Sequence, residues 1–174
     1  MFKIHYQKGD RIVYGMSGIC EVEGIKSLSL SREKPKTMYY ILKPLSNAGS
    51  TIFVPCDNEA LRAKMRNILS KDEIDHILAQ AKGKQMAWID DRRLRSENFH
   101  EILSKGIRNE LLLLISCIYL KKQELHACGK KLSSDDEAIL QSGQKLVEEE
   151  FSCALHTKPE EVGKYIRTAL GINN

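Results

Sequence analysis

The chain has 174 residues, of which 42% are hydrophobic and 29% are charged, and its net charge is +4. This composition is typical of a soluble globular protein with one medium domain or two small ones. No apolar run approaches the roughly 20 residues that a membrane span needs, and the N-terminus lacks the apolar middle of a secretory signal. The five cysteines lie far apart without a C-x-x-C pair, so we expect neither a disulfide scaffold nor a zinc site but a cytoplasmic protein.

The first 57 residues have the alternating and β-branched pattern of strands. Four short runs stand between turn-rich segments: 10–14, 19–25, 37–42 and 51–55. Their connections are short enough for hairpins. This pattern predicts a small, strongly bent antiparallel sheet or barrel-like module, which we assign to a domain covering residues 1–60.

After Pro55 the periodicity becomes helical. Ser70 and Glu73 form a capping box for a helix that ends near Gly83. Further helices are expected at 87–104, at 107–127, from a cap at Ser134 to Leu155, and from a cap at Thr157 onward. The predicted fold class is therefore α+β, with the β module followed by an all-α bundle of four to five helices in residues 61–174.

No pattern in the chain indicates catalysis. The Gly15-Met16-Ser17-Gly18 segment fits a hairpin turn better than a nucleophile elbow, and the phosphate-binding glycine loops are absent. The five histidines lack metal-ligand spacing. The acidic run 148–150 is most simply a solvated helix face. We therefore predict a protein that is not an enzyme and that needs neither a metal nor a cofactor.

The segment MAWIDDRRLRSENF, residues 86–99, holds the only tryptophan, Trp88, beside Arg92, Arg93 and Arg95. On a helix, Trp88, Arg92, Arg95 and Phe99 would share one face. A single tryptophan is most often a core residue. However, arginines on the same face would place unpaired charges in a core, which is costly, and this favours an exposed indole beside phosphate-binding arms. The helical phasing alone leaves both interpretations open.

Several motifs, taken in order, resemble the CarD/CdnL family of bacterial transcription regulators. The resemblance begins with F-K-x₅-G-D-x-x-V-Y-x₃-G from Phe2 and Lys3 to Gly18 and continues with Y-Y-I-L-K at 39–43 and V-P-x-x-N at 54–58. W-I-D-D-R-R-x-R at 88–95 and the K-K-L-S loop at 130–133 follow. No single motif is diagnostic, but their order extends over nearly the whole chain.

The resemblance implies a fold and a role. The N-terminal module would be Tudor-like and would bind the β subunit of bacterial RNA polymerase. The C-terminal helices would contact promoter DNA, with low sequence specificity, at the upstream edge of the transcription bubble and so stabilise the open complex. Trp88 would be a wedge in the minor groove, with Arg92, Arg93 and Arg95 as phosphate arms. Lys130 and Lys131 would form a second backbone contact.

The sequence departs from the family at some of the positions that contact polymerase. Some relatives have arginine where this chain has Phe53, before the Val-Pro turn at Pro55, and others have arginine where it offers Lys26 or Leu28. We therefore expect a more apolar polymerase contact formed by these four residues. A monomer is expected. The alternative function is a protein-only adaptor in which Trp88 is a core or protein-contact residue.

Overall fold

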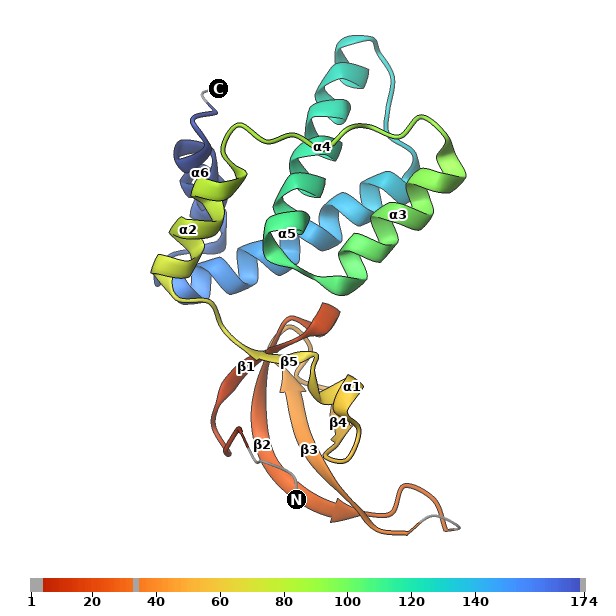
Figure 1. Cartoon of the computed structure of the whole chain (residues 1–174), viewed down its shortest axis with the longest axis vertical. Coiled ribbons are helices and arrows are strands. Elements are labelled where there is room, and N and C mark those ends of the chain that lie inside the picture. The colour runs from red at the N-terminus through yellow and green to blue at the C-terminus, as the bar shows by residue number, and fades with distance from the viewer. Residues whose placement is uncertain (1–4, 33–34, 173–174) are drawn as a thin grey trace. The chain divides into compact units, whose positions relative to one another are not determined.

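A computed structural model describes residues 5–32 and 35–172 of the chain, which divides into two compact units, Met1–Ile68 and Leu69–Asn174 (Figure 1). Phe2 and Lys3, with which the family motif begins, lie outside the described residues. Among the described helices, none is long and apolar enough to cross a membrane.

The first unit is an antiparallel sheet with the strand order β4-β3-β2-β1-β5. The strands are β1 Arg11–Tyr14, β2 Ile19–Leu28, β3 Thr37–Pro44, β4 Ile52–Pro55 and β5 Met65–Asn67. The four predicted strands are confirmed, and residues 15–17 form a 3-10 turn between the first two. Within the described residues β4 and β5 are the two edges and do not pair, so the sheet is open and the term barrel-like applies only loosely.

One face of this sheet carries the core of the unit. The long hairpin of β2 and β3 contains a β-bulge between Val22 and Gly24. The φ of Gly24 is 141°, a backbone angle that residues with a side chain rarely adopt. The bulge bends the strands so that one face closes over apolar side chains. The buried residues of this core are Ile12, Cys20, Val22, Tyr40, Leu42, Val54, Cys56 and Met65.

The expected end of the first domain at residue 60 differs from the observed division after Ile68. A short helix, α1 (Glu59–Arg62), follows β4, with Asn58 as its N-cap. The chain then returns to the sheet as β5, which pairs with β1 at Val13 and Arg66. A strand of three residues is too short to show an alternating pattern, so the sequence did not indicate it.

The second unit is helical, and its described residues form α2 (Lys71–Ala81), α3 (Arg92–Lys105), α4 (Arg108–Ala127), α5 (Ser134–Leu155) and α6 (Pro159–Leu170). This number of helices confirms the predicted bundle. The helix α5 contacts each of the other four, so it is the central element of the unit (Figure 1). The largest buried side chains include Phe99, Leu111, Ile118 and Phe151.

The helix starts show where local patterns were sufficient. The capping box of α2 is confirmed, because Ser70 Oγ accepts from Glu73 N and Glu73 accepts from Ser70 N. The cap of α5 is Ser133 rather than Ser134, and α6 begins after Lys158 without a side-chain cap from Thr157. The helix expected at 87–104 begins only at Arg92, which changes the interpretation of Trp88.

A buried ion pair joins α4 to α5 and corrects the prediction for the acidic run 148–150. Glu150 is 1% exposed and accepts from Arg108 Nε, so it does not belong to a solvated face. The same carboxylate accepts from the backbone N of Leu69 at 3.0 Å. Glu150 therefore fastens the start of the helical unit to its central helix.

Candidate nucleic-acid interface

Trp88 lies in a non-helical segment between α2 and α3, not on the face of α3. Asp91 is the N-cap of α3, and its side chain accepts from Leu94 N at 2.9 Å. The four residues before Arg92 are therefore outside the helix, and the predicted helical phasing of Trp88 with Arg92, Arg95 and Phe99 was wrong. The three later residues do lie on one helix, but Trp88 reaches them from the segment that precedes it.

The indole of Trp88 is half-buried and rests on the helical core. Its ring meets that of Phe99 edge to face, with the centroids 5.8 Å apart and the planes at 70°, an arrangement that aromatic pairs favour. Two cations lie over the same indole: the Arg95 guanidinium at 4.5 Å and the Lys121 ammonium at 5.6 Å. Trp88 is thus neither a fully buried core residue nor a freely exposed one.

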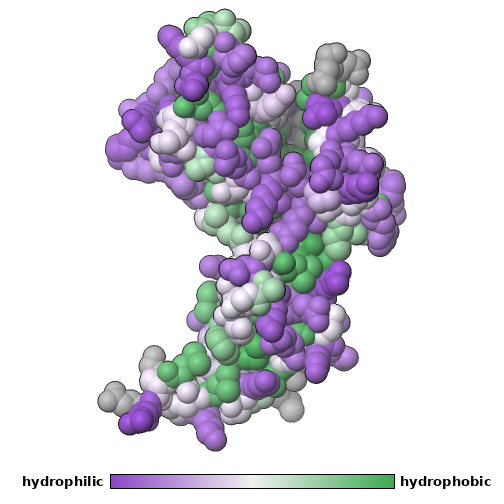
Figure 2. Space-filling model, turned by 180° about the vertical axis from the view of Figure 1, so that it is seen from behind, coloured by the Kyte–Doolittle hydropathy of each residue, from purple (hydrophilic) through white to green (hydrophobic). Residues whose placement is uncertain are grey.

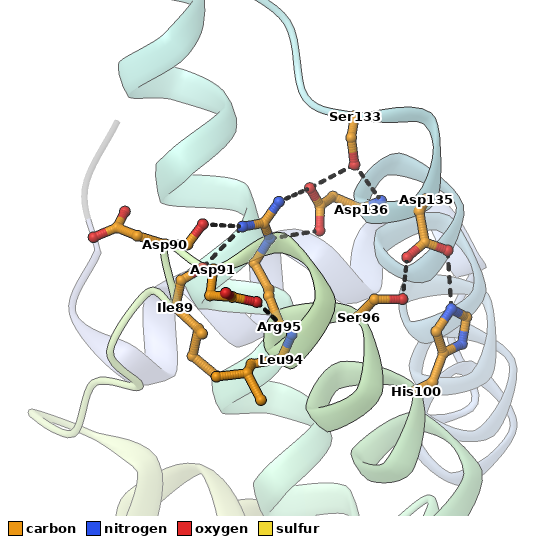
Figure 3. Close-up of polar contacts among 10 residues, drawn as sticks. All are labelled: Ile89, Asp90, Asp91, Leu94, Arg95, Ser96, His100, Ser133, Asp135 and Asp136. Atoms are coloured by element: carbon orange, nitrogen blue, oxygen red, sulfur yellow. Dashed lines mark hydrogen bonds and ion pairs between the residues drawn. The ribbon is translucent and has the colours of Figure 1, made fainter.

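Arg95 is a buried residue whose hydrogen bonds are satisfied within the unit. It is 8% exposed. Its Nε and Nη2 donate to the two carboxylate oxygens of Asp136 at 3.0 and 3.1 Å, and its Nη1 donates to the backbone oxygens of Ile89 at 2.8 Å and Asp90 at 3.2 Å (Figure 3). A buried guanidinium needs this compensation. Its fixed place under Trp88 does not suit a phosphate arm.

Asp136 is itself held in place at the start of α5. Ser133 caps the helix by accepting from Asp136 N at 3.1 Å, and its hydroxyl donates to the Asp136 carboxylate at 2.6 Å. Asp136 is 3% exposed. The carboxylate therefore accepts three hydrogen bonds, two from Arg95 on α3 and one from Ser133, the N-cap of α5.

A second, more exposed contact joins the same two helix starts. Asp135 accepts from Ser96 Oγ at 2.7 Å and lies 2.9 Å from His100 Nε2 (Figure 3). The Ser96 hydrogen bond, followed by the His100 hydrogen bond, lowers the pKa of Asp135 below its ordinary value, and Arg92 adds a smaller electrostatic effect. The serine bonds the carboxylate rather than the imidazole, so the arrangement is not that of a catalytic triad.

The remaining predicted cations are exposed. Arg92 and Arg93 occupy the first turn of α3, and Lys130 and Lys131 lie in the loop that leads into Ser133. Arg93 donates to Glu97 at 3.0 Å in an exposed i,i+4 pair. Among the described carboxylates, none forms an ion pair with Arg92, and the positive end of the helix dipole lies at the same place. Arg92 is therefore the cation best placed to meet a phosphate.

The four predicted polymerase-binding residues share one face of the sheet. The register places Lys26 opposite Tyr39, and Tyr39 opposite Pro55, so these three side chains point the same way. Leu28 and Phe53 lie two residues from Lys26 and Pro55 and therefore point to that face as well. Phe53 is 42% exposed. We call Lys26, Leu28, Tyr39, Phe53 and Pro55 the outer sheet face.

The sequence did not indicate Tyr39 as a functional residue. Its ring meets that of Phe53 edge to face on the outer sheet face, with the centroids 6.4 Å apart. Lys121 and Asp136 were also missed, because the contacts that bring them to Trp88 and Arg95 come from α4 and α5. Among the described residues, no group of three or more His, Cys, Asp or Glu side chains could hold a metal ion.

Residues 6–69 match the family model of the CarD-like/TRCF RID domain. This part of the chain is therefore a CarD-like/TRCF RID domain. The match covers all five strands of the sheet unit, including all of the outer sheet face, and ends before Trp88. The CarD-like domain is a protein-interaction domain rather than a catalytic one. No curated protein matches the chain.

Proposed function

We propose that the protein binds the β subunit of bacterial RNA polymerase through its sheet unit and stabilises the open promoter complex through Trp88. The observation that carries the proposal is the half-buried indole, held by Phe99 and Arg95 and followed four residues later by the exposed Arg92. An aromatic ring with one part anchored and another part accessible can press against unstacked bases without losing its own orientation. The protein would act in the cytoplasm as a monomer.

The polymerase contact is supported by the class of the N-terminal domain and by its outer sheet face. CarD-like domains belong to a family of RNA polymerase-interacting transcription factors. The two aromatic rings of this face, with Leu28 and Pro55 on the same face, form the kind of apolar cluster that dominates protein interfaces. The edge strand β4 carries Phe53 and offers its outer side for pairing with a strand of the partner.

The DNA contact is supported by the position of four exposed cations in the helical unit. Arg92 and Arg93 follow Trp88 within five residues, and Lys130 and Lys131 precede the Ser133 cap that leads to Asp136 and Arg95. The phosphate arms of the proposal are therefore Arg92 and Arg93, with Lys130 and Lys131 as a second contact. Arg95 does not have this role in the proposal, because its N–H groups donate to Asp136 and to the backbone oxygen of Ile89.

The mechanism is a shift of equilibrium between closed and open promoter. Binding to polymerase raises the local concentration of the helical unit at the promoter. The indole then favours the unstacked junction over the closed duplex, and only that difference in affinity moves the equilibrium. A preference of about 1.4 kcal/mol shifts the ratio about tenfold. Phosphate contacts do not depend on sequence, so many promoters would respond.

The test is the lifetime of open complexes formed by bacterial polymerase with and without the protein. Trp88→Ala should remove the lengthening of the lifetime while polymerase binding stays close to that of the wild type. Because the indole packs on Phe99, the variant is compared at a temperature where circular dichroism shows it folded. Trp88→Phe keeps an apolar ring and should retain part of the effect. An unchanged lifetime with wild-type protein that demonstrably binds polymerase would rule out the wedge.

A second candidate function is a protein-only adaptor, and an apolar groove in the helical unit favours it. The groove lies between α4, α5 and α6, encloses about 140 Å³ and includes the exposed side chains of Tyr119, Leu120 and Ile172. In Figure 2, green surface lies in the hollow between the purple flanks of this unit. If Leu120→Ser abolishes the effect on transcription while Trp88→Ala does not, the adaptor replaces the wedge.

A further inference from the structure

We propose that Asp136 is a positioning residue for Trp88, acting through the guanidinium of Arg95. The functional part of this inference rests on the proposed wedge, whereas the structural part concerns only the orientation of the indole. We call Asp136, Arg95 and Trp88 the indole clamp. The clamp joins the central helix α5, the start of α3 and the segment before α3 at one point.

The guanidinium of Arg95 has two tasks in the clamp. Its Nη1 donates to the carbonyl oxygens of Ile89 and Asp90, the two residues that follow Trp88, and so fixes the backbone from which the indole projects. Its central carbon, Cζ, lies over the indole ring, 4.5 Å from the ring centroid, and so supports the ring itself. The backbone and the ring of the same residue are therefore held by a single side chain.

Asp136 decides where that guanidinium lies. The bidentate pair fixes both the position and the plane of the Arg95 fork, which a single point contact would not do. The carboxylate is oriented in turn by the Ser133 hydroxyl. Without Asp136 the guanidinium would keep only the two carbonyl contacts, and its plane would be free to turn away from the indole.

The other buried ion pair provides a matched comparison. Arg108 and Glu150 also join a helix to α5, with side chains that are 3% and 1% exposed against 9% and 4% for Arg95 and Asp136. Among the described residues, the aromatic and cation contacts of the indole ring come from Arg95, Lys121 and Phe99, so Arg108 and Glu150 take no part in them. Replacing either pair perturbs a buried charge pair of the helical unit, but only one pair contacts the indole.

The experiment uses the full chain and the fact that Trp88 is its only tryptophan. Two double variants replace each pair by apolar side chains of similar size, which a fold often tolerates: Arg95→Met/Asp136→Leu and, as control, Arg108→Met/Glu150→Leu. Tryptophan emission and its quenching by iodide report on the indole. Open-complex lifetime reports on its use. Emission, quenching and lifetime are all measured under conditions in which circular dichroism shows that each variant is folded.

The clamp variant should move the emission to longer wavelength, increase quenching by iodide and shorten the open-complex lifetime about fivefold, the factor that about 1 kcal/mol of lost ring support corresponds to. The control variant should leave all three unchanged. The single variant Asp136→Asn should shift the emission in the same direction, so that the proposal can be tested if a double variant does not fold.

Equal emission and quenching in the clamp and control variants would overturn the proposal. So would an altered emission with an unaltered lifetime, provided that Trp88→Ala abolishes the lifetime effect. If Trp88→Ala itself leaves the lifetime unchanged, the proposed function fails. In that case the emission and quenching alone decide whether Asp136 positions the indole.

Discussion

Arg95 and Asp136, 41 residues apart in the chain, form an ion pair with two hydrogen bonds, from Nε at 3.0 Å and from Nη2 at 3.1 Å. The guanidinium of this pair lies against the ring of Trp88. The pair connects the stability of the helical bundle to the geometry of its one tryptophan. Substitutions of Arg95 and Asp136 should therefore have different effects from substitutions of the exposed Arg92 and Arg93.

Arg95→Ala should lower the free energy of unfolding by about 3–5 kcal/mol, because removing one partner leaves the other charge of a buried pair without compensation. The measurement is urea unfolding followed by circular dichroism. Arg92→Ala is the matched control, since Arg92 is exposed and should change the value by less than about 0.5 kcal/mol. Similar stabilities for the two variants would contradict the burial of Arg95.

Arg92→Ala should weaken binding to a forked promoter fragment and reduce its dependence on salt. Each phosphate contact that is lost lowers the slope of log K against log salt by about 0.9 on duplex DNA. Arg93→Ala should have a smaller effect, because Arg93 already pairs with Glu97. Titrations at several salt concentrations check this, and an unchanged slope for Arg92→Ala would exclude it as a phosphate contact.

Local signals accounted for the parts of the fold that the sequence predicted. The capping box at Ser70 and Glu73 and the alternation in the first four strands involve neighbours in the chain, so both are visible without a structure. The start of α3 had a local signal too, because aspartate is a favoured N-cap. The spacing of Trp88 with the arginines predicts a longer helix, whereas the N-cap Asp91 starts α3 at Arg92, four residues after Trp88.

The parts that the sequence could not indicate depend on distant partners. Nothing near Arg95 distinguishes it from Arg92 and Arg93, and its burial follows from Asp136 in another helix. The same holds for Glu150, whose partner Arg108 lies 42 residues away. The residues of the outer sheet face come together through the register of β2, β3 and β4. The bulge at Gly24 shifts the pairing of β2 with β3 by one residue.

Asp135→Asn should change the stability of the protein at acid pH. The hydrogen bonds from Ser96 and His100 lower the pKa of Asp135 below its ordinary value of 3.8. Because the folded pKa is depressed, the stabilisation is present above 3.8 and is lost as the pH falls through the lower folded value. The unfolding free energy of the wild type should therefore fall more steeply than that of Asp135→Asn over this range.

Unfolding curves measured from neutral pH down to the acid limit of folding check this dependence. Glu97→Gln serves as control, since its carboxylate pairs only with the exposed Arg93. Parallel profiles for wild type and Asp135→Asn would show that the contact between the starts of α3 and α5 does not contribute to stability.

Phe53→Asp should weaken binding to RNA polymerase at least tenfold, a loss of about 1.4 kcal/mol or more. The substitution places a charge on the outer sheet face and removes the edge-to-face partner of Tyr39. The fold should remain intact, because the Phe53 side chain is 42% exposed and points away from the core of the sheet unit.

Leu45→Asp is the matched control for Phe53→Asp. Leu45 is 44% exposed in the same unit but lies in the turn after β3, outside the outer sheet face. Binding is measured by the dissociation constant with bacterial polymerase and with its isolated β subunit. Equal losses for the two variants would indicate a nonspecific effect of charge, whereas a loss at Phe53 alone supports this face as the polymerase contact.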